Sequence, residues 1–150
     1  MRLVIQRVKR AGVSIRGQLH AAIEQGFMVL LGIGENDNEE DVAYLCARLC
    51  AMRVFADEEG KMNLDITQIN GEILLISQFT LHASTKKGNR PSFIKAARPE
   101  KAAPLYEKFI AETGRLLGKP CKSGVFGADM QVELINDGPV TIVMDSKIRE

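Results

Sequence analysis

Hydrophobic and polar residues follow two different periods along this chain, one typical of strands and the other of helices. The segment from Leu3 to Ile15 mixes β-branched and basic residues, and Phe27 to Gly32 is a short apolar run; both are predicted to be strands. After Asn38 comes a cluster of acidic residues, followed by apolar residues at helical spacing: Val42, Leu45, Cys46, Leu49 and Met52. That order predicts an amphipathic helix.

The second half of the chain repeats this succession of strand and helix. Glu72 to Leu81 has an apolar centre, Ile73 to Ile76, which is typical of a strand buried on both faces in the middle of a sheet. Pro99 to Leu117 has apolar residues at helical spacing and is followed by a glycine and a proline, which end helices. Two further strands, with a turn between them, are predicted at Val125 to Ile135 and Val140 to Met144.

Strands outnumber helices in this prediction, and most connections are short. We therefore expect an α+β fold with two main helices packed on a mixed or antiparallel sheet, or on a barrel-like sheet. The 150 residues, of which 45% are hydrophobic, suffice for one sizeable core, so residues 1–150 are predicted to form a single domain. No long apolar run suggests a signal peptide or a membrane span.

Cysteine usage and charge each add one expectation. The three cysteines, Cys46, Cys50 and Cys121, lack Cys-x-x-Cys spacing, which favours core packing in a reducing compartment, the cytoplasm. The formal net charge is only +1, but residues 86–101 contain six basic residues and one acidic residue. The start of this stretch is either a solubilising loop or a contact for phosphates, made by Lys86, Lys87 and Arg90.

Polar side chains gather where the predicted central strand ends. In an extended strand, Gln78, Thr80 and His82 would lie on one face and Ser77 on the other. Such an end either lines a pocket and presents backbone N–H groups to an oxyanion, or simply emerges into solvent. Because the alternation separates Ser77 from His82, a Ser-His-Asp triad is not expected.

Two other features concern backbone carbonyls. Arg7 is in phase with Leu3 and Ile5, so it should point inward and find a carboxylate or a backbone carbonyl, unless it lies at an edge. A bond such as Gly138-Pro139 is able to adopt the cis form and aim two carbonyls at an ammonium group, although trans is the commoner isomer. Neither a metal nor a cofactor is predicted, since no ligand set and no glycine-rich phosphate loop is found.

Two motifs together closely resemble the signatures of the D-aminoacyl-tRNA deacylase family: Ser77-Gln78-Phe79-Thr80-Leu81 and Asn136-Asp137-Gly138-Pro139-Val140-Thr141. Residues 60–64, 87–93 and 124–130 are also similar to that family, so the resemblance covers essentially the whole chain. It implies a homodimer that hydrolyses the ester between a D-amino acid, or mischarged glycine, and the terminal adenosine of tRNA.

The same resemblance implies how the substrate is held. Gly138 and Pro139 would be joined by a cis bond and reach into the partner subunit, where their carbonyls hold the substrate amino group and leave no room for an L side chain. Arg7 would support this loop. Further substrate contacts are implied for Phe126 and Met130, and tRNA contacts for Lys86, Lys87 and Arg90.

The catalytic residues implied are Ser77, Gln78, Thr80 and, through its backbone N–H, Phe79. Two mechanisms compete: Thr80 acts as a nucleophile, or the terminal 2′-hydroxyl of the tRNA assists the attack of water. The second is preferred, because no general base is evident beside Thr80 and an unassisted threonine hydroxyl is a poor nucleophile. Two other function classes remain open, a non-catalytic tRNA-binding module and a general hydrolase of small esters.

Overall fold

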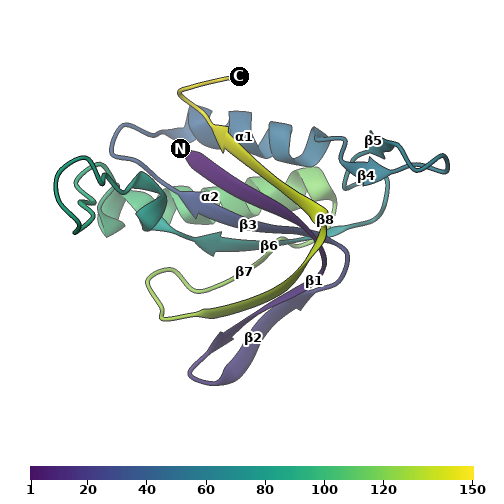
Figure 1. The fold of residues 1–150 in the computed structure, drawn as a ribbon, viewed down its shortest axis with the longest axis horizontal. Coiled ribbons are helices and arrows are strands. Elements are labelled where there is room, and N and C mark those ends of the chain that lie inside the picture. Colours follow the sequence, from purple (N-terminus) through teal and green to yellow (C-terminus); the bar gives the residue numbers. More distant parts are fainter.

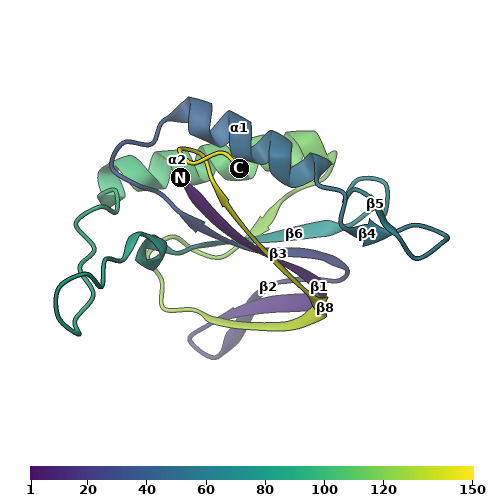
Figure 2. The ribbon, with the colours of Figure 1, turned by 45° about the horizontal axis from the view of Figure 1, so that its top comes forward.

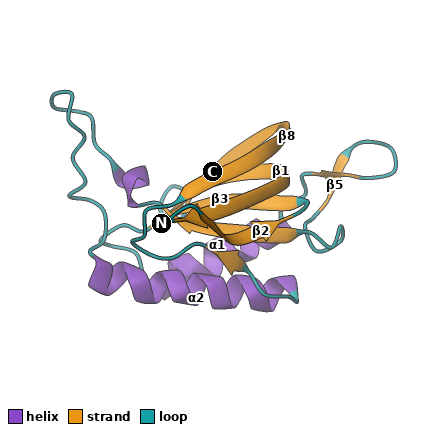
Figure 3. Ribbon diagram, turned by 90° about the horizontal axis from the view of Figure 1, so that it is seen from below, coloured by secondary structure: helices purple, strands orange, loops and turns teal.

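Residues 1–150 are described by a computed structural model, in which two helices lie across one face of a curved sheet (Figures 1 and 3). The helices are α1 (Glu39–Ala51) and α2 (Pro99–Leu117), and a short 3-10 helix, η1, covers Phe79–His82. The strands are β1 (Arg2–Ile15), β2 (Gln18–Ile23), β3 (Gly26–Gly32), β4 (Phe55–Ala56), β5 (Met62–Leu64), β6 (Glu72–Ser77), β7 (Lys122–Ser123) and β8 (Gln131–Asp145). None of the helices combines the length and apolar character needed to cross a membrane.

The main sheet is mixed. Its strand order is β2-β1-β3-β6-β7, and β8 pairs with β1 as well. β1 is antiparallel to β2, β3 and β8, whereas β3 with β6 and β6 with β7 are parallel. Because the long β1 pairs with three strands, the sheet curls into a nearly closed, barrel-like shape (Figure 1). The expectation of two helices on a mixed, barrel-like sheet is confirmed.

Both predicted helices are confirmed, and their ends follow the capping rules. The side chain of Asn38 accepts hydrogen bonds from the N–H groups of Glu40 and Asp41, and the Asp41 carboxylate accepts one from the Asn38 N–H in return. Helix α2 begins with Pro99, and its last residue, Leu117, is followed by the capping residue Gly118, which adopts a left-handed backbone with φ of 74°. Local sequence signals therefore set the start of α1 and both ends of α2.

The central position of β6 is also confirmed, because Ile73 to Ile76 are all buried. Ile73 and Leu75 belong to a cluster of 24 buried residues beneath the helices, and Leu74 and Ile76 to a cluster of 7 on the other face. The three cysteines lie in the larger cluster, where burial raises the pKa of Cys46, Cys50 and Cys121 to about 12, 11 and 12. Their predicted packing role is confirmed.

The strand prediction is wrong in two regions of the chain. The strand that begins at Glu72 ends at Ser77, because the chain then turns into η1 instead of continuing extended to Leu81. Near the C-terminal end, two strands and a turn were predicted from Val125 onward, but β8 begins at Gln131 and runs through Asp145 without a break. Pairing with β1 continues past residues 136–139 with two register shifts, so the turn-forming residues make a bulge rather than a hairpin.

Two segments project from opposite ends of the sheet (Figures 1 and 3). One is the loop that follows η1, and the other is the hairpin of β4 and β5. The first and last described residues lie near each other beside α1 (Figure 2), where the Ser146 N–H donates to the Met1 carbonyl over 2.9 Å.

Candidate functional site

A pocket of ≈ 620 Å³ opens where β3 and β6 end. Ser77, Gln78 and Phe79 form one wall, and Phe126 and Met130 lie among the residues that complete it. The remaining lining residues are largely apolar and come from the ends of β3 and β6, from residues 93–102 and from residues 127–132. Because β3 and β6 run parallel, their carboxyl ends meet at this edge, and the pocket thus unites five of the predicted site residues.

The pocket wall formed by the first signature, residues 77–81, carries backbone N–H groups without a hydrogen-bond partner. The Gln78 N–H continues the ladder by donating to the Leu31 carbonyl over 2.8 Å, and the chain then tightens into η1. The Gln78 side-chain amide donates to the Thr80 hydroxyl over 2.6 Å. The backbone N–H groups of Phe79 and Thr80 donate to no protein acceptor. Such unpaired donors beside a pocket are what stabilisation of an oxyanion requires.

Ser77 and His82 form no triad, but for a reason other than strand alternation. Because residues 79–82 are helical, strand alternation does not separate Ser77 from His82. The imidazole of His82 is nevertheless buried, its Nε2 atom has no hydrogen-bond partner, and no bond joins it to Ser77 or Thr80. Burial lowers the pKa of His82, which favours the neutral ring. Neither hydroxyl has a general base in contact.

Two aromatic residues of the site were not predicted. Phe93 packs edge-on against Phe79 at the pocket, with ring centroids 5.2 Å apart. On the opposite side, Tyr106 of α2 lies behind Phe126 at 5.7 Å between centroids, and its hydroxyl donates to the Leu75 carbonyl over 3.1 Å. Phe93 belongs to a segment that resembles the family, so the sequence could have indicated it as a site residue. Tyr106 could not have been found in this way, because its spacing in the sequence is that of an ordinary core residue of a helix.

Lys86, Lys87 and Arg90 lie in the projecting loop beyond η1, outside the pocket lining. All three are exposed and form no ion pair. The base of the loop is closed by Ser84 and Ser92, whose N–H and carbonyl groups bond reciprocally at 2.8 and 2.9 Å. The basic side chains therefore lie on a loop with a closed base, between Phe79 and Phe93, which line the pocket.

Arg7 and the second signature lie at the other end of the sheet, because Arg7 pairs with Phe27 near the start of β3 and donates to Val54, directly before β4. The predicted inward arginine is confirmed: its side chain is 14% exposed, and its guanidinium donates to the carbonyls of Asp137 and Val54. It also lies 3.5 Å from the Asp137 carboxylate. Gly138 and Pro139 are exposed, the bond between them is cis, and neither they nor Arg7 line the pocket of the same chain.

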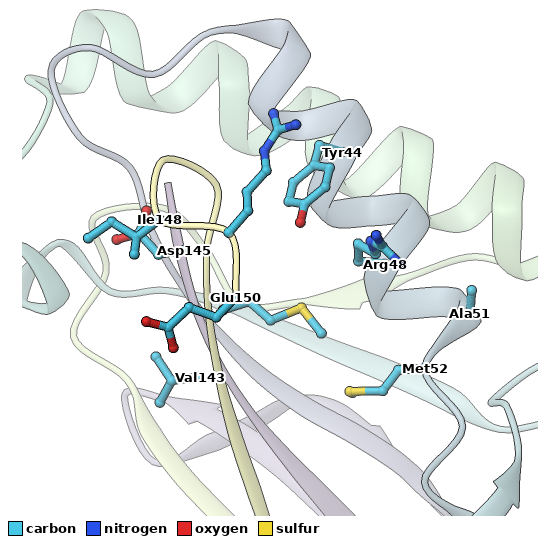
Figure 4. Close-up of a pocket in the computed structure, with 10 residues that line it drawn as sticks. Tyr44, Arg48, Ala51, Met52, Val143, Asp145, Ile148 and Glu150 are labelled. Carbon is cyan, nitrogen blue, oxygen red and sulfur yellow. The ribbon is translucent and has the colours of Figure 1, made fainter.

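A second pocket, of ≈ 510 Å³, lies between α1 and the end of β8 (Figure 4). Tyr44, Arg48 and Met52 project into it from the helix side, and the Arg149 guanidinium lies 3.9 Å from the centre of the Tyr44 ring. None of the predicted site residues lines this pocket. The pocket at the end of β6 is therefore the candidate site.

Two helices on one face of a nearly closed mixed sheet define the fold class of the D-amino acid tRNA deacylases. A solved structure described as a probable eukaryotic D-amino acid tRNA deacylase superposes with a TM-score of 0.83, over 95% of this chain and 97% of that chain. At 16% sequence identity, this likeness establishes the fold alone. The sequence model of the D-Tyr-tRNA(Tyr) deacylase family matches residues 4–145, and the chain belongs to this family.

Similar proteins extend over the full chain. Two relatives named D-aminoacyl-tRNA deacylase, from Cytophaga hutchinsonii and Akkermansia muciniphila, are each 60% identical; they align over 98% and 100% of both chains, respectively. A solved structure of a c-Myc DNA unwinding element binding protein is 39% identical, with a TM-score of 0.92 over 97% of this chain and 98% of that one. The family membership indicated by the two signatures is confirmed.

Proposed function

We propose that this protein hydrolyses the ester between a D-amino acid and the terminal adenosine of tRNA, releasing the free amino acid and the tRNA. The observation that carries the proposal is the pocket at the end of β6, where Ser77, Gln78 and the unpaired Phe79 N–H lie together in a chain of the deacylase family. Such a reaction removes D-amino acids from tRNA before translation. Glycyl-tRNA is proposed as a second substrate, because glycine has no side chain to exclude.

In the proposed chemical step, water attacks the ester carbonyl with help from the 2′-hydroxyl of the terminal adenosine. The developing oxyanion is stabilised by the Phe79 N–H, while Ser77, Gln78 and Thr80 position the substrate. Geometry at Thr80 supports this choice: its hydroxyl is bonded to the Gln78 amide, which offers a donor and no base. The 2′-hydroxyl arrives with the substrate, next to the ester that is cleaved.

Replacing Thr80 with alanine is expected to reduce kcat by about tenfold or less, because it removes one positioning contact and leaves the attacking group in place. Single-turnover hydrolysis of D-aminoacyl-tRNA measures this effect. The variant Thr80→Ser, which keeps the hydroxyl, should be nearly as active as the parent protein. Complete loss in folded Thr80→Ala, together with an acyl group trapped on Thr80 of the parent protein, would show that Thr80 is the nucleophile.

We further propose that discrimination between D and L substrates is made by Gly138 and Pro139 of a partner subunit in a homodimer. Within one chain these residues are exposed at the end of the sheet away from the pocket, so they serve a pocket only if a second copy receives them. Their carbonyls would hold the substrate amino group and Arg7 would fix the loop. Backbone carbonyls contact the groups on the α-carbon of the substrate and make no contact with its side chain, so many D-amino acids should be accepted.

The assay that tests the function compares hydrolysis of matched D-, L- and glycyl-tRNA esters by the purified protein. Cleavage of the D and glycyl esters with the L ester spared supports both the reaction and the discrimination between D and L. Equal cleavage of the D and L esters would support the hydrolase activity and reject the proposed discrimination by Gly138 and Pro139. Binding of tRNA without cleavage of any ester would leave a tRNA-binding module as the function.

The basic loop is proposed to contact the tRNA backbone. Replacing Lys86, Lys87 and Arg90 together with alanine is expected to raise KM about tenfold and to flatten its dependence on salt, with little change in kcat. A control variant with alanine at Lys9, Arg10 and Arg48 removes the same charge from exposed sites elsewhere and should leave KM nearly unchanged. Equal effects of the two triple variants would reject a local contact. A hydrolase of small esters would instead cleave simple aryl esters without regard to salt.

A further inference from the structure

The short helix η1 ends in a buried histidine that is seated on two glycines. His82 is 9% exposed, and its ring packs against the end of β3. A Cβ atom at Gly32 would lie 3.3 Å from the imidazole and 2.8 Å from the Leu81 Cβ, and one at Gly34 would lie 3.0 Å from the imidazole. Glycine at both positions thus makes room for the last turn of η1. The orientation of this turn fixes where Phe79 and Thr80 stand.

A second contact holds the same turn. Arg2 of β1 donates from Nη1 to the Leu81 carbonyl and from Nε to the Asp145 carboxylate, both over 2.9 Å. This arginine therefore ties η1 to β1 and β8. It also places a permanent positive charge beside His82, because a guanidinium stays protonated.

The surroundings of His82 disfavour a proton on its ring. Two cations face it, the Arg2 guanidinium and the Met1 ammonium, and one anion, Asp37. The Asp37 carboxylate is already bonded to the Met1 ammonium and to the Gly34 N–H, each over 2.6 Å, and forms no ion pair with His82. The Gly32 carbonyl bonds one edge of the ring, but Nε2 is buried without a partner, so an imidazolium here would be a desolvated cation whose second N–H lacks an acceptor.

We propose that His82 is a positioning residue of the deacylation site, which seats η1 on β3 only as a neutral imidazole, so that its protonation displaces Phe79 and Thr80 and stops the reaction. This inference rests on the proposed function. His82 does not touch the substrate; it acts through the turn that carries the oxyanion donor and the Thr80 hydroxyl. Acid therefore inactivates the site without removing any group that binds the ester.

The pH range follows from the direction of the pKa shift. Burial, the largest cause, together with the Arg2 and Met1 charges, outweighs the Gly32 hydrogen bond and the Asp37 charge and lowers the pKa of His82 below its usual 6.5. Below pH 6.5 an unfolded or displaced His82 binds a proton that the seated ring does not. The stability of the seated turn is therefore complete above that pH and is lost as the pH falls from 6.5 through the lowered pKa.

The test is the pH dependence of kcat for D-aminoacyl-tRNA, measured for the parent protein, His82→Gln and His20→Gln. Glutamine keeps an N–H donor but takes no proton, and His20 is the exposed control. In the parent protein and the control, kcat should fall together as the pH drops from 6.5 through the lowered pKa of His82. His82→Gln should flatten this limb, so that its activity relative to the parent rises about tenfold at the acid end, with KM little changed. An acid limb that is identical in His82→Gln overturns the proposal.

A second measurement, an NMR titration, requires neither an activity assay nor a variant protein. The chain has 2 histidines, so NMR separates the titration of His82 from that of His20. The backbone amides of Phe79 and Thr80 should shift with the His82 titration and not with that of His20. If the chemical shifts of these two amides do not change as His82 titrates, the inference is rejected, whether or not His82→Gln folds. A parent protein that cleaves no ester at any pH rejects the proposed function instead, and the NMR titration still decides the role of His82.

Discussion

Arg7→Ala is expected to lower kcat/KM for D-aminoacyl-tRNA about 100-fold, since a misplacement of about 1 Å in a substrate-holding group costs that much. Arg7 is the one side chain that joins the loop of the second signature to the segment before β4, through the carbonyls of Asp137 and Val54. Without the guanidinium, nothing else bonds these two carbonyls together. The loop that is proposed to enter the partner subunit would lose its defined position.

The same substitution should also cost stability, by about 2 kcal/mol, because it leaves a buried carbonyl and a half-buried carboxylate without their donor. Arg10→Ala is the matched control, since Arg10 is exposed on the same strand. Arg7→Lys should fall between, because an ammonium on a flexible chain does not reproduce two directional bonds from a planar group. Thermal unfolding and steady-state kinetics measure the two effects. Normal activity in Arg7→Ala would remove Arg7 from the substrate-holding loop.

The elements that the sequence predicted well are those whose signals are local. Helix α1 has its N-cap at Asn38, and α2 has Pro99 at its start and Gly118 directly after its end. In each segment the capping residues therefore agree with the helical spacing of the apolar residues. The central strand β6 was recognisable from an unbroken apolar run, because only a strand covered on both faces buries four such residues in a row.

The errors arose where the pattern depends on distant partners. Residues 78–81 have the alternation of a strand, but the bond from Arg2 and the packing against Gly32 and Gly34 hold them as a 3-10 turn. Residues 136–139 have the composition of a hairpin turn, yet β1 pairs with β8 on both sides of them and turns the segment into a bulge. In both cases, contacts across the sheet outweigh local preference.

In the candidate site, too, the residues with a local signal were predicted from the sequence, and those that depend on distant contacts were not. Ser77, Gln78 and Phe79 were predicted as a polar strand end, and the pocket forms there. The opposite wall was implied only by family resemblance, because the approach of residues 126–130 to β6 depends on packing that no local signal encodes. Tyr106, which lies behind Phe126, has the spacing of an ordinary core residue, and its bond to the Leu75 carbonyl appears only in the folded chain.

The second large effect is expected for Gly138→Ala. Gly138 has φ of +125°, a conformation that L residues rarely adopt, and an added Cβ would lie 3.0 Å from both the Arg7 guanidinium and the Val140 side chain. The methyl group therefore has to displace the arginine or the loop. We expect kcat/KM for the D ester to fall about 100-fold and the preference for D over L to decrease, as the carbonyls that hold the amino group move.

Gly17→Ala provides the control for backbone strain alone. Gly17 also has a positive φ, of +75°, but no atom lies within 4 Å of its added Cβ. Both variants should therefore lose about 1 kcal/mol of folding stability from the backbone, while Gly138→Ala alone loses activity. Equal activities of Gly17→Ala and Gly138→Ala would reject a role for Gly138 in holding substrate.

Mixed dimers then decide whether Gly138 acts within its own subunit or in the partner. Ala128 lines the pocket, so Ala128→Trp should block that site while leaving the loop of the second signature intact. In a dimer of Gly138→Ala with Ala128→Trp, the open pocket receives an intact loop only if the loop crosses between subunits. Random mixing of the two inactive variants should then restore about one quarter of the parent activity, because half of the dimers are mixed and each has one complete site. If each loop served its own pocket, mixing would restore nothing.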